Sequence, residues 1–169
     1  SCLSHVSHFP SHLPLTHLSF SGSGPNKAAL EALRGHFVPL AKHKFGSNVV
    51  EKCVTCGEWA LVDVTEEIFA TKDGLEMLLN DKYGNYVIQN IIQRCDLDGD
   101  LLPALRGRIA EYDHIHKGWN ETVMGRRILQ KLVKRMGKRV KRMQVAEKEE
   151  EVRRCSAVAP HLSALRLLI

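Results

Sequence analysis

Several features that define large protein classes are missing from this 169-residue chain. No apolar run reaches the roughly eighteen residues of a membrane-spanning helix, so we expect no transmembrane segment. No charged leader precedes an apolar stretch at the start, which argues against a secretory signal. Alternating apolar and polar runs bounded by turn residues are absent too, so β-strands find no support. The chain should therefore be all-helical.

Signatures of catalysis are also missing. The chain contains no glycine-rich phosphate loop, no nucleophile elbow and no HExxH zinc motif. We therefore expect neither enzymatic activity nor a cofactor.

Cysteine is present, but not in the pattern of a disulfide framework. The five cysteines stand at irregular spacings, which suits a reducing compartment, and we predict a cytoplasmic location. Cys53 and Cys56 form a CxxC pair, but a zinc or redox site would require a second pair or a βαβ context. Cys53 corresponds to Ile91 in the repeat described below, so we expect a buried thiol.

The two ends of the chain differ in composition from its middle. Residues 1–24 mix Ser, His, Leu and Pro without a helical period, so we expect disorder or a loosely held arm. The histidines of this arm are irregularly spaced and have no Cys or carboxylate cluster beside them, so we predict no metal site. Residues 138–169 form a charged tail, with a basic block before an acidic one. A solvated helix and a disordered tail both fit this pattern.

Net charge is +5, from 24 Lys and Arg against 19 Asp and Glu. This excess is compatible with a polyanionic partner but does not require one.

The most informative feature is a segment that recurs. Lys44–Val54 reads KFGSNVVEKCV, and 38 residues further on Lys82–Ile92 reads KYGNYVIQNII. A fainter copy, Val123–Leu132, places its glycine another 41 residues along. A period of about 40 residues is typical of helical repeat arrays.

Apolar periodicity predicts that each unit has a short helix, a longer helix and a third helix. Ser47 should stand at or near the N-cap of the helix that begins at Gly46. We expect residues 112–120 to form an irregular lead-in to the last helix. The expected helices cover residues 25–35, 38–44, 46–54, 59–70, 75–80, 85–95, 101–110 and 121–136.

Three polar positions vary in step between the two clear copies. The first triplet is Ser47, Asn48 and Glu51, and the second triplet is Asn85, Tyr86 and Gln89. The first and third members of each are four residues apart, so they share a helix face. One polar triplet alone is usually a solvated surface, but two copies in register indicate a shared role.

The chemistry of each triplet matches the edge of a nucleic-acid base. Glu51 offers two acceptors to the adjacent N1–H and N2 amino donors of guanine, with Ser47 as a neighbouring contact. The amides of Asn85 and Gln89 both donate and accept, as the uracil edge requires. The ring of Tyr86 can stack on a base, which is worth about 1–3 kcal/mol. Reading single-stranded RNA at one base per helical repeat is a known mode of recognition.

The motifs HKFGSNVVEKCV (43–54) and LNDKYGNYVIQNII (79–92) resemble the last two RNA-binding repeats of the Pumilio/PUF family. The resemblance extends more weakly from about Asn26 to Met136. It implies a curved, right-handed α-solenoid of three-helix, armadillo-like repeats. The concave face of such an array holds single-stranded RNA.

The resemblance also assigns roles to residues. The first triplet would read a guanine, with Asn48 at the stacking position, and the second would read a uracil, with Tyr86 stacking. Because the family binds RNA antiparallel to its repeats, the two would read 5′-UG-3′, the start of a UGUA-type element in the 3′ untranslated region of an mRNA. The implied role is post-transcriptional regulation by translation repression or decay, with protein co-regulators as further partners.

The same resemblance divides the middle of the chain, residues 25–137, as the C-terminal part of a Pumilio homology domain. Residues 25–35 would end a preceding repeat, 36–72 and 73–110 would be two repeats, and 111–137 would be a capping pseudo-repeat. Family members typically carry eight repeats, so the array would be truncated on its N-terminal side. Two bases give little affinity, and we expect weak RNA binding by this chain alone.

Two alternatives fit the same pattern. A helical-repeat scaffold for protein partners would leave both triplets merely solvated. A divergent PUF-like protein would grip nucleic acid through its backbone without reading sequence, and its affinity would fall steeply with salt.

Overall fold

The computed structural model describes the backbone of residues 23–165 and the side chains of residues 27–154. Within these residues the chain forms helices and connecting turns without any strand, as predicted. The elements are α1 (Ser23–Leu33), α2 (Phe37–Ala41), α3 (Gly46–Cys53), α4 (Glu58–Ala70), α5 (Gly74–Asn80), α6 (Gly84–Arg94), α7 (Leu101–Ile115), the 3-10 turn η1 (Trp119–Glu121) and α8 (Val123–Leu165). The predictions for the arm and its histidines fall on residues 1–22, outside the described part.

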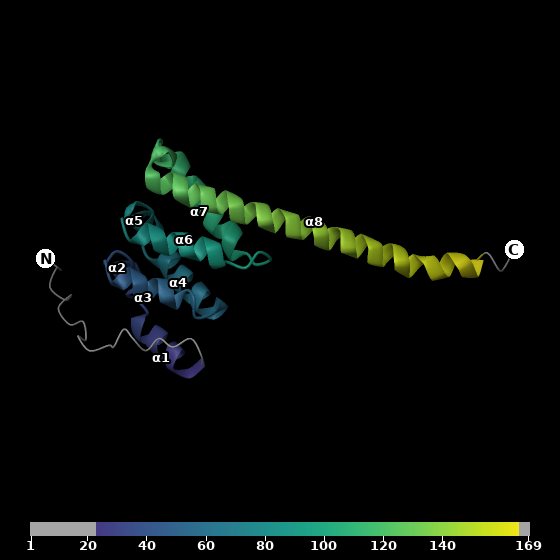
Figure 1. Cartoon of the computed structure of the whole chain (residues 1–169), viewed down its shortest axis with the longest axis horizontal. Helices are drawn as coiled ribbons and strands as arrows, with labels where there is room; N and C mark the ends of the chain where they lie inside the picture. The colour runs from purple at the N-terminus through teal and green to yellow at the C-terminus, as the bar shows by residue number, and fades with distance from the viewer. Residues whose placement is uncertain (1–22, 166–169) are drawn as a thin grey trace.

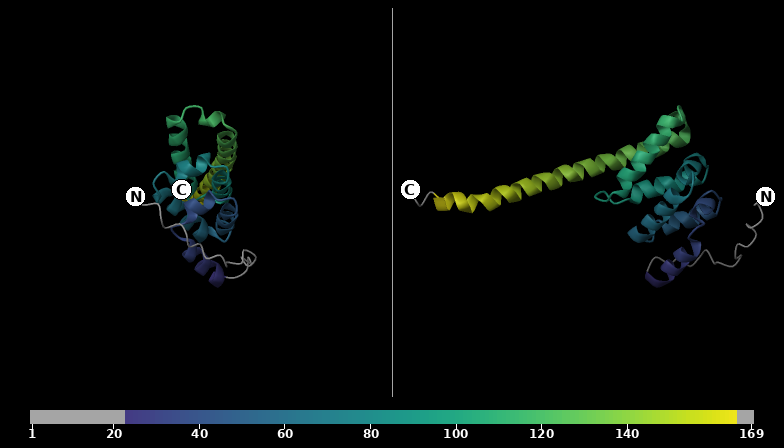
Figure 2. Two further views of the ribbon diagram at one scale, coloured as in Figure 1. Left: turned by 90° about the vertical axis from the view of Figure 1, so that its left-hand side faces the viewer. Right: turned by 180° about the vertical axis from the view of Figure 1, so that it is seen from behind.

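Two three-helix units follow α1, namely α2–α3–α4 and α5–α6–α7. The middle helices α3 and α6 pack side by side, and the first turns of α8 pack on the other side of α6. In Figure 1 these three helices lie one above another and run in a similar direction. The views in Figure 2 show the same order from α1 to α8. We call α3, α6 and the first turns of α8 the inner layer.

A continuous hydrophobic core joins the units, because equivalent positions of the three copies are apolar. Cys53, Ile91 and Leu132 occupy the same place in the three copies, and all are buried. Burial raises the pKa of the Cys53 thiol to about 12, so the thiol stays protonated. The prediction of a buried thiol is confirmed.

Each inner-layer helix has a glycine in its first turn that closely approaches the element before it. A Cβ built on Gly46 would lie 2.5 Å from the carbonyl oxygen of Leu40, and one on Gly84 would lie 2.7 Å from Cδ2 of Leu78. A Cβ on Gly125 would likewise meet the carbonyl oxygen of η1. Only hydrogen fits at these points, which explains the glycine common to all three copies.

A side chain two or three residues ahead holds the start of each inner-layer helix. Asp81 Oδ1 accepts the first amides of α6 at 2.8 Å, and His43 Nδ1 accepts those of α3 at 3.3 Å. Thr122 Oγ1 accepts the amide of the α8 glycine at 3.0 Å. Helix α3 begins at Gly46 as predicted, but Ser47 does not cap it: its hydroxyl donates to the carbonyl oxygen of Lys44, and His43 accepts the first amides.

The C-terminal part differs most from expectation. Helix α7 runs five residues past the predicted end at Ala110, because Tyr112 is buried and packs edge-on against Trp119 with ring centroids 5.4 Å apart. Helix α8 passes through Gly137 without a break. Of the two alternatives for the tail, the structure adopts the solvated helix: the described side chains from Lys141 onward are all exposed.

None of the helices in the described part combines the length and apolar character needed to cross a bilayer. In residues 27–154 no three His, Cys, Asp or Glu side chains come together as a metal site would require.

The glycine contacts yield a test. Gly84→Ala should lower the free energy of unfolding by about 1–3 kcal/mol, because the added methyl group overpacks the contact with Leu78. Gly107→Ala is the matched control: a Cβ at this helix-interior glycine would meet no atom of another element within 4 Å, so Ala should stabilise by about 0.5–1 kcal/mol. Urea denaturation of both variants measures the difference. Equal stability of Gly84→Ala and wild type would show that the contact relaxes.

Candidate nucleic-acid interface

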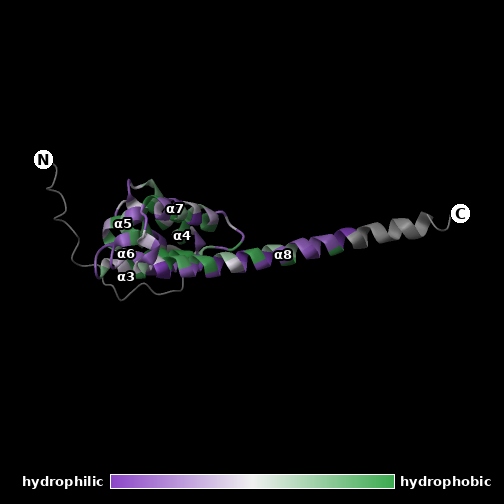
Figure 3. Cartoon of the chain, turned by 90° about the horizontal axis from the view of Figure 1, so that it is seen from above, coloured by the Kyte–Doolittle hydropathy of each residue, from purple (hydrophilic) through white to green (hydrophobic). Residues whose placement is uncertain are grey.

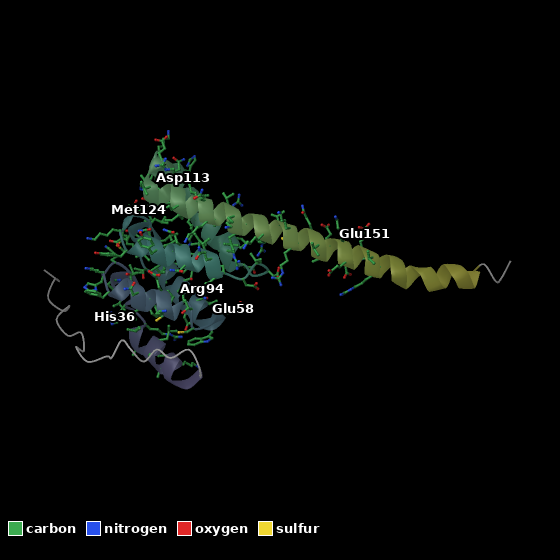
Figure 4. The ribbon with its side chains drawn as sticks, viewed as in Figure 1. His36, Glu58, Arg94, Asp113, Met124 and Glu151 are labelled. Carbon is green, nitrogen blue, oxygen red and sulfur yellow. The ribbon has the colours of Figure 1, made fainter. Side chains whose placement is uncertain are left out.

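The two triplets lie at the same end of adjacent inner-layer helices. Each triplet begins one residue after the first glycine of its helix, Gly46 in α3 and Gly84 in α6. Figure 4 places Met124, near the start of α8, at one end of the layer and Arg94, at the end of α6, at the other. Since the helices point the same way and pack together, the triplets form a row, which we call the triplet row.

The row continues onto α8, where the equivalent positions carry basic and amide side chains. These are Arg126, Arg127 and Gln130, which line a shallow surface hollow together with Val123. The helix that was predicted to cap the array therefore adds positive charge at the end of the row.

The second triplet contains a preformed amide pair. Gln89 Nε2 donates to Asn85 Oδ1 at 2.8 Å, and Asn85 Nδ2 donates to the carbonyl oxygen of Asp81 at 2.8 Å. Both amide side chains are largely buried, with 3% and 4% of their surface exposed. Tyr86 is 46% exposed, so its ring is available for stacking.

The amide pair keeps unused hydrogen-bonding positions. Neither Asn85 nor Gln89 has a fully buried side-chain polar atom without a partner; in the described part of the chain such atoms occur in Asp113, Trp119 and Arg135. The open positions are Gln89 Oε1, one hydrogen on Gln89 Nε2 and one on Asn85 Nδ2. Together they offer one acceptor and two donors, held by hydrogen bonds that already exist.

The first triplet is arranged less tightly. Ser47 is 4% exposed, and its hydroxyl donates to the carbonyl oxygen of Lys44 over a long 3.4 Å. Asn48 is exposed, at the position that Tyr86 holds in the next copy. Glu51 is half-buried, and its carboxylate accepts a hydrogen bond from Asn90 Nδ2 at 2.6 Å.

The environment of Glu51 shifts its titration. Burial raises the pKa of the Glu51 carboxyl, while the hydrogen bond from Asn90 and the charges of Lys131 and Lys52 lower it in part. Asn90 lies on α6 and Lys131 on α8, so all three inner-layer helices act on this one carboxylate. The Asn90 contact fixes one carboxylate oxygen, Oε2.

Reasoning from sequence missed Asn90 and Lys131. Asn90 follows the last member of the second triplet directly, and its equivalent in the first copy is Lys52. A polar residue at this place in both copies was a usable signal, because it lies on the side of the helix that turns toward its neighbour. Lys131 holds the same place in the third copy, but its nearness to Glu51 depends on how α8 packs and could not be predicted from this register.

Three-helix units with an inner layer and a row of equivalent polar side chains define a helical-repeat protein of the α-solenoid class. The family model for a Pumilio-family RNA binding repeat matches residues 36–58 and 78–98. Two segments of the chain thus match repeats of the Pumilio/PUF family, one in each three-helix unit. The prediction of family and fold is confirmed.

Individual relatives agree with this placement. Pumilio homolog 11 of Arabidopsis thaliana is 34% identical over 83 residues, which is 49% of this chain and 14% of the relative. Pumilio homology domain family member 4 of Saccharomyces cerevisiae is 34% identical over 73 residues, 41% of this chain and 8% of the relative. The chain thus spans a small part of these relatives.

A solved structure has the same arrangement of helices. It is a Puf4 double mutant bound to the Cox17 RNA 3′ UTR recognition sequence, with 30% sequence identity and a TM-score of 0.54. The similarity covers 63% of this chain and 35% of the Puf4 chain.

The contact between Asn90 and Glu51 is testable without a ligand. Asn90→Ala removes a donor that favours the ionised carboxylate, so the pKa of Glu51 should rise further above its ordinary value. Carboxyl-carbon NMR titration of Glu51 measures the change. Asn120→Ala, at an exposed amide whose contact is with Asp113, is the control and should leave Glu51 unchanged. An unchanged Glu51 pKa in Asn90→Ala would contradict the contact.

Proposed function

We propose that this chain binds single-stranded RNA along the triplet row at one base per repeat, and that it reads 5′-UG-3′. The observation that carries the proposal is the preformed amide pair of Asn85 and Gln89, with its open acceptor and donors. The family match and the RNA-bound Puf4 structure support the choice of RNA as the ligand.

The amide pair suits uracil. The uracil edge presents one N–H donor between two carbonyl acceptors, and the pair offers one acceptor, Gln89 Oε1, with donors on Gln89 Nε2 and Asn85 Nδ2. Because the pair is held in place before binding, little side-chain entropy is lost when the base arrives. Cytosine presents a different order of donors and acceptors, so it would leave groups unpaired.

Glu51 suits guanine. Two adjacent donors of guanine can share the carboxylate, and the Ser47 hydroxyl lies one helical turn away on the same face. The hydrogen bond from Asn90 limits rotation of the carboxylate. Adenine has no N1–H donor and would face the carboxylate with a lone pair, which disfavours it.

Base order and biological role follow from the family. Antiparallel binding places the base on α6 to the 5′ side of the base on α3, which gives 5′-UG-3′. We propose that the protein recognises UGUA-type elements of mRNA in the cytoplasm and regulates translation or decay, with protein co-regulators as further partners. Recognition beyond UG would require repeats other than those described here.

Base substitution in the RNA tests the reading directly. Changing G to A in a UG-containing RNA should weaken binding of the full chain on the order of tenfold, because the half-buried Glu51 carboxylate then lacks a donor, which costs about 1–3 kcal/mol. Glu51→Gln should reduce this preference, and the U position should stay as selective as in wild type. Fluorescence anisotropy with labelled RNAs gives the dissociation constants.

The outcomes separate the proposal from its alternatives. Equal binding of UG and UA RNAs with a steep salt dependence would identify a binder that does not read sequence. No binding of any RNA at low salt would favour a protein scaffold. Tyr86→Ala should weaken binding of every RNA by about 1–3 kcal/mol, and Phe45→Ala, also at an exposed aromatic residue, is the matched control.

As the pH falls, the preference for guanine should be lost at a higher pH than the titration of an ordinary glutamate would give. The folded protein holds the pKa of Glu51 above its usual value, so the carboxylate is present above this raised pKa and is lost as pH falls through it. The ratio of UA to UG dissociation constants should therefore decline with falling pH, and in Glu51→Gln it should not change with pH. If the ratio stays constant down to the pH at which an ordinary glutamate titrates, Glu51 does not read the guanine.

A further inference from the structure

Helix α8 is strongly basic where it leaves the body of the protein. No acidic residue occurs between Glu121 and Glu147, whereas Arg and Lys recur throughout this stretch. Figure 3 shows α8 extending well beyond the other helices, with hydrophilic residues predominant outside the body. This charge falls on two faces of the helix with different surroundings.

One face is occupied by the loop between α6 and α7. Arg135 donates to the carbonyl oxygen of Cys95 at 2.5 Å, and Arg139 donates to those of Leu97 and Gly99 at 2.5 Å. Further along, Arg142 pairs with Asp98 at 3.0 Å. These contacts fix the direction in which α8 leaves the body.

The other face is open. Its basic residues recur at i, i+4, i+7, i+11 and i+14, which keeps them on one side of a helix. This basic stripe comprises Arg127, Lys131, Lys134, Lys138 and Lys141. All of them except Lys131 are exposed, and within residues 27–154 none forms an ion pair. At 1.5 Å per residue the stripe is about 21 Å long.

The basic stripe begins at the triplet row. Arg127 occupies the row position on α8 that corresponds to Asn48 and Tyr86. Lys131, one turn further, is close enough to Glu51 for its charge to favour the ionised carboxylate. The stripe is therefore continuous with the face that carries both triplets.

We propose that the basic stripe binds the phosphate backbone of RNA on the 5′ side of the UG dinucleotide, without reading bases. The inference rests on the proposed function for the direction of the RNA. The uracil position on α6 is the 5′ one, and α8 packs against the side of α6 away from α3. A strand that continues in the 5′ direction thus meets α8 and its stripe.

Phosphate is the ligand that the stripe suits best. Lysine acts as a compact point charge that binds phosphate without a fixed geometry, as a mobile backbone requires. A row of lysines that forms no ion pair within residues 27–154 also gains from releasing the counterions of the RNA. The basic stripe would add phosphate contacts, and so affinity, to the two base contacts, which give little affinity alone.

A triple variant and two RNAs test the proposal. Lys134→Gln, Lys138→Gln and Lys141→Gln together remove three charges and keep good helix formers. The control removes the same charge elsewhere, through Lys27→Gln, Lys72→Gln and Lys117→Gln, all at exposed positions. The probes are RNAs of equal length with one UG and a cytidine flank placed either 5′ or 3′ of it. Binding is measured against salt with the full chain.

The 5′-flanked RNA should bind the wild type more tightly than the 3′-flanked RNA does. In the triple variant, the slope of log affinity against log salt for the 5′-flanked RNA should be smaller by about 2, which is about 20-fold less loss of affinity between roughly 50 and 200 mM salt. The 3′-flanked RNA and the control variant should behave as wild type. Lys138→Gln alone should give about a third of the change in slope, should the triple variant unfold.

An unchanged affinity and salt slope in the triple variant overturns the proposal, and so does an equal loss for both RNAs. Replacing UG by CC separates the two hypotheses. If the preference for UG is absent but the triple variant still weakens binding of the 5′-flanked RNA, the stripe binds phosphate while the base-reading assignment fails. If UG is preferred but the triple variant has no effect, the stripe assignment alone is wrong.

Discussion

The close approach of each inner-layer helix to the element before it governs the rest of the structure. A glycine at the first position of α3 and α6 and at the third position of α8 lets the helix approach the preceding element at a distance that no Cβ allows. This contact sets where each helix starts, and the triplet follows the glycine directly. The spacing of the triplet row is therefore fixed by backbone packing, so the polar residues can vary without shifting the row.

Polar burial in the row has a cost that hydrogen bonds offset. Asn85 and Gln89 are almost fully buried, and they remain tolerable because they bond to each other and to a backbone carbonyl. Glu51 is half-buried with its pKa raised, so its carboxylate is held in a setting that disfavours charge. Groups kept in such settings gain more from a matching partner than solvated ones do.

Helix α8 combines two tasks that would conflict if they shared a face. Ile128 and Leu132 close the core, and three arginines bind the carbonyl groups and the aspartate of the α6–α7 loop. The lysines lie on a separate face, where they do not compete for those carbonyls and form no ion pair in the described part of the chain, although Lys131 lies near the Glu51 carboxylate. Anchoring thus leaves the remaining positive charge free for a ligand.

The sequence by itself determined the helical repeat, its family, the buried Cys53 and the position of each triplet, because these follow from local periodicity and from identical spacing in the copies. Tertiary structure alone decided that His43 rather than Ser47 holds the start of α3, since the hydrogen bonds there depend on the path of the turn. It also decided that Asn90 and Lys131 act on Glu51, and that α8 continues past Gly137. Those outcomes depend on which helix faces lie together, because Asn90 and Lys131 are about 40 and 80 residues from Glu51 in the chain and come near it only once the helices pack.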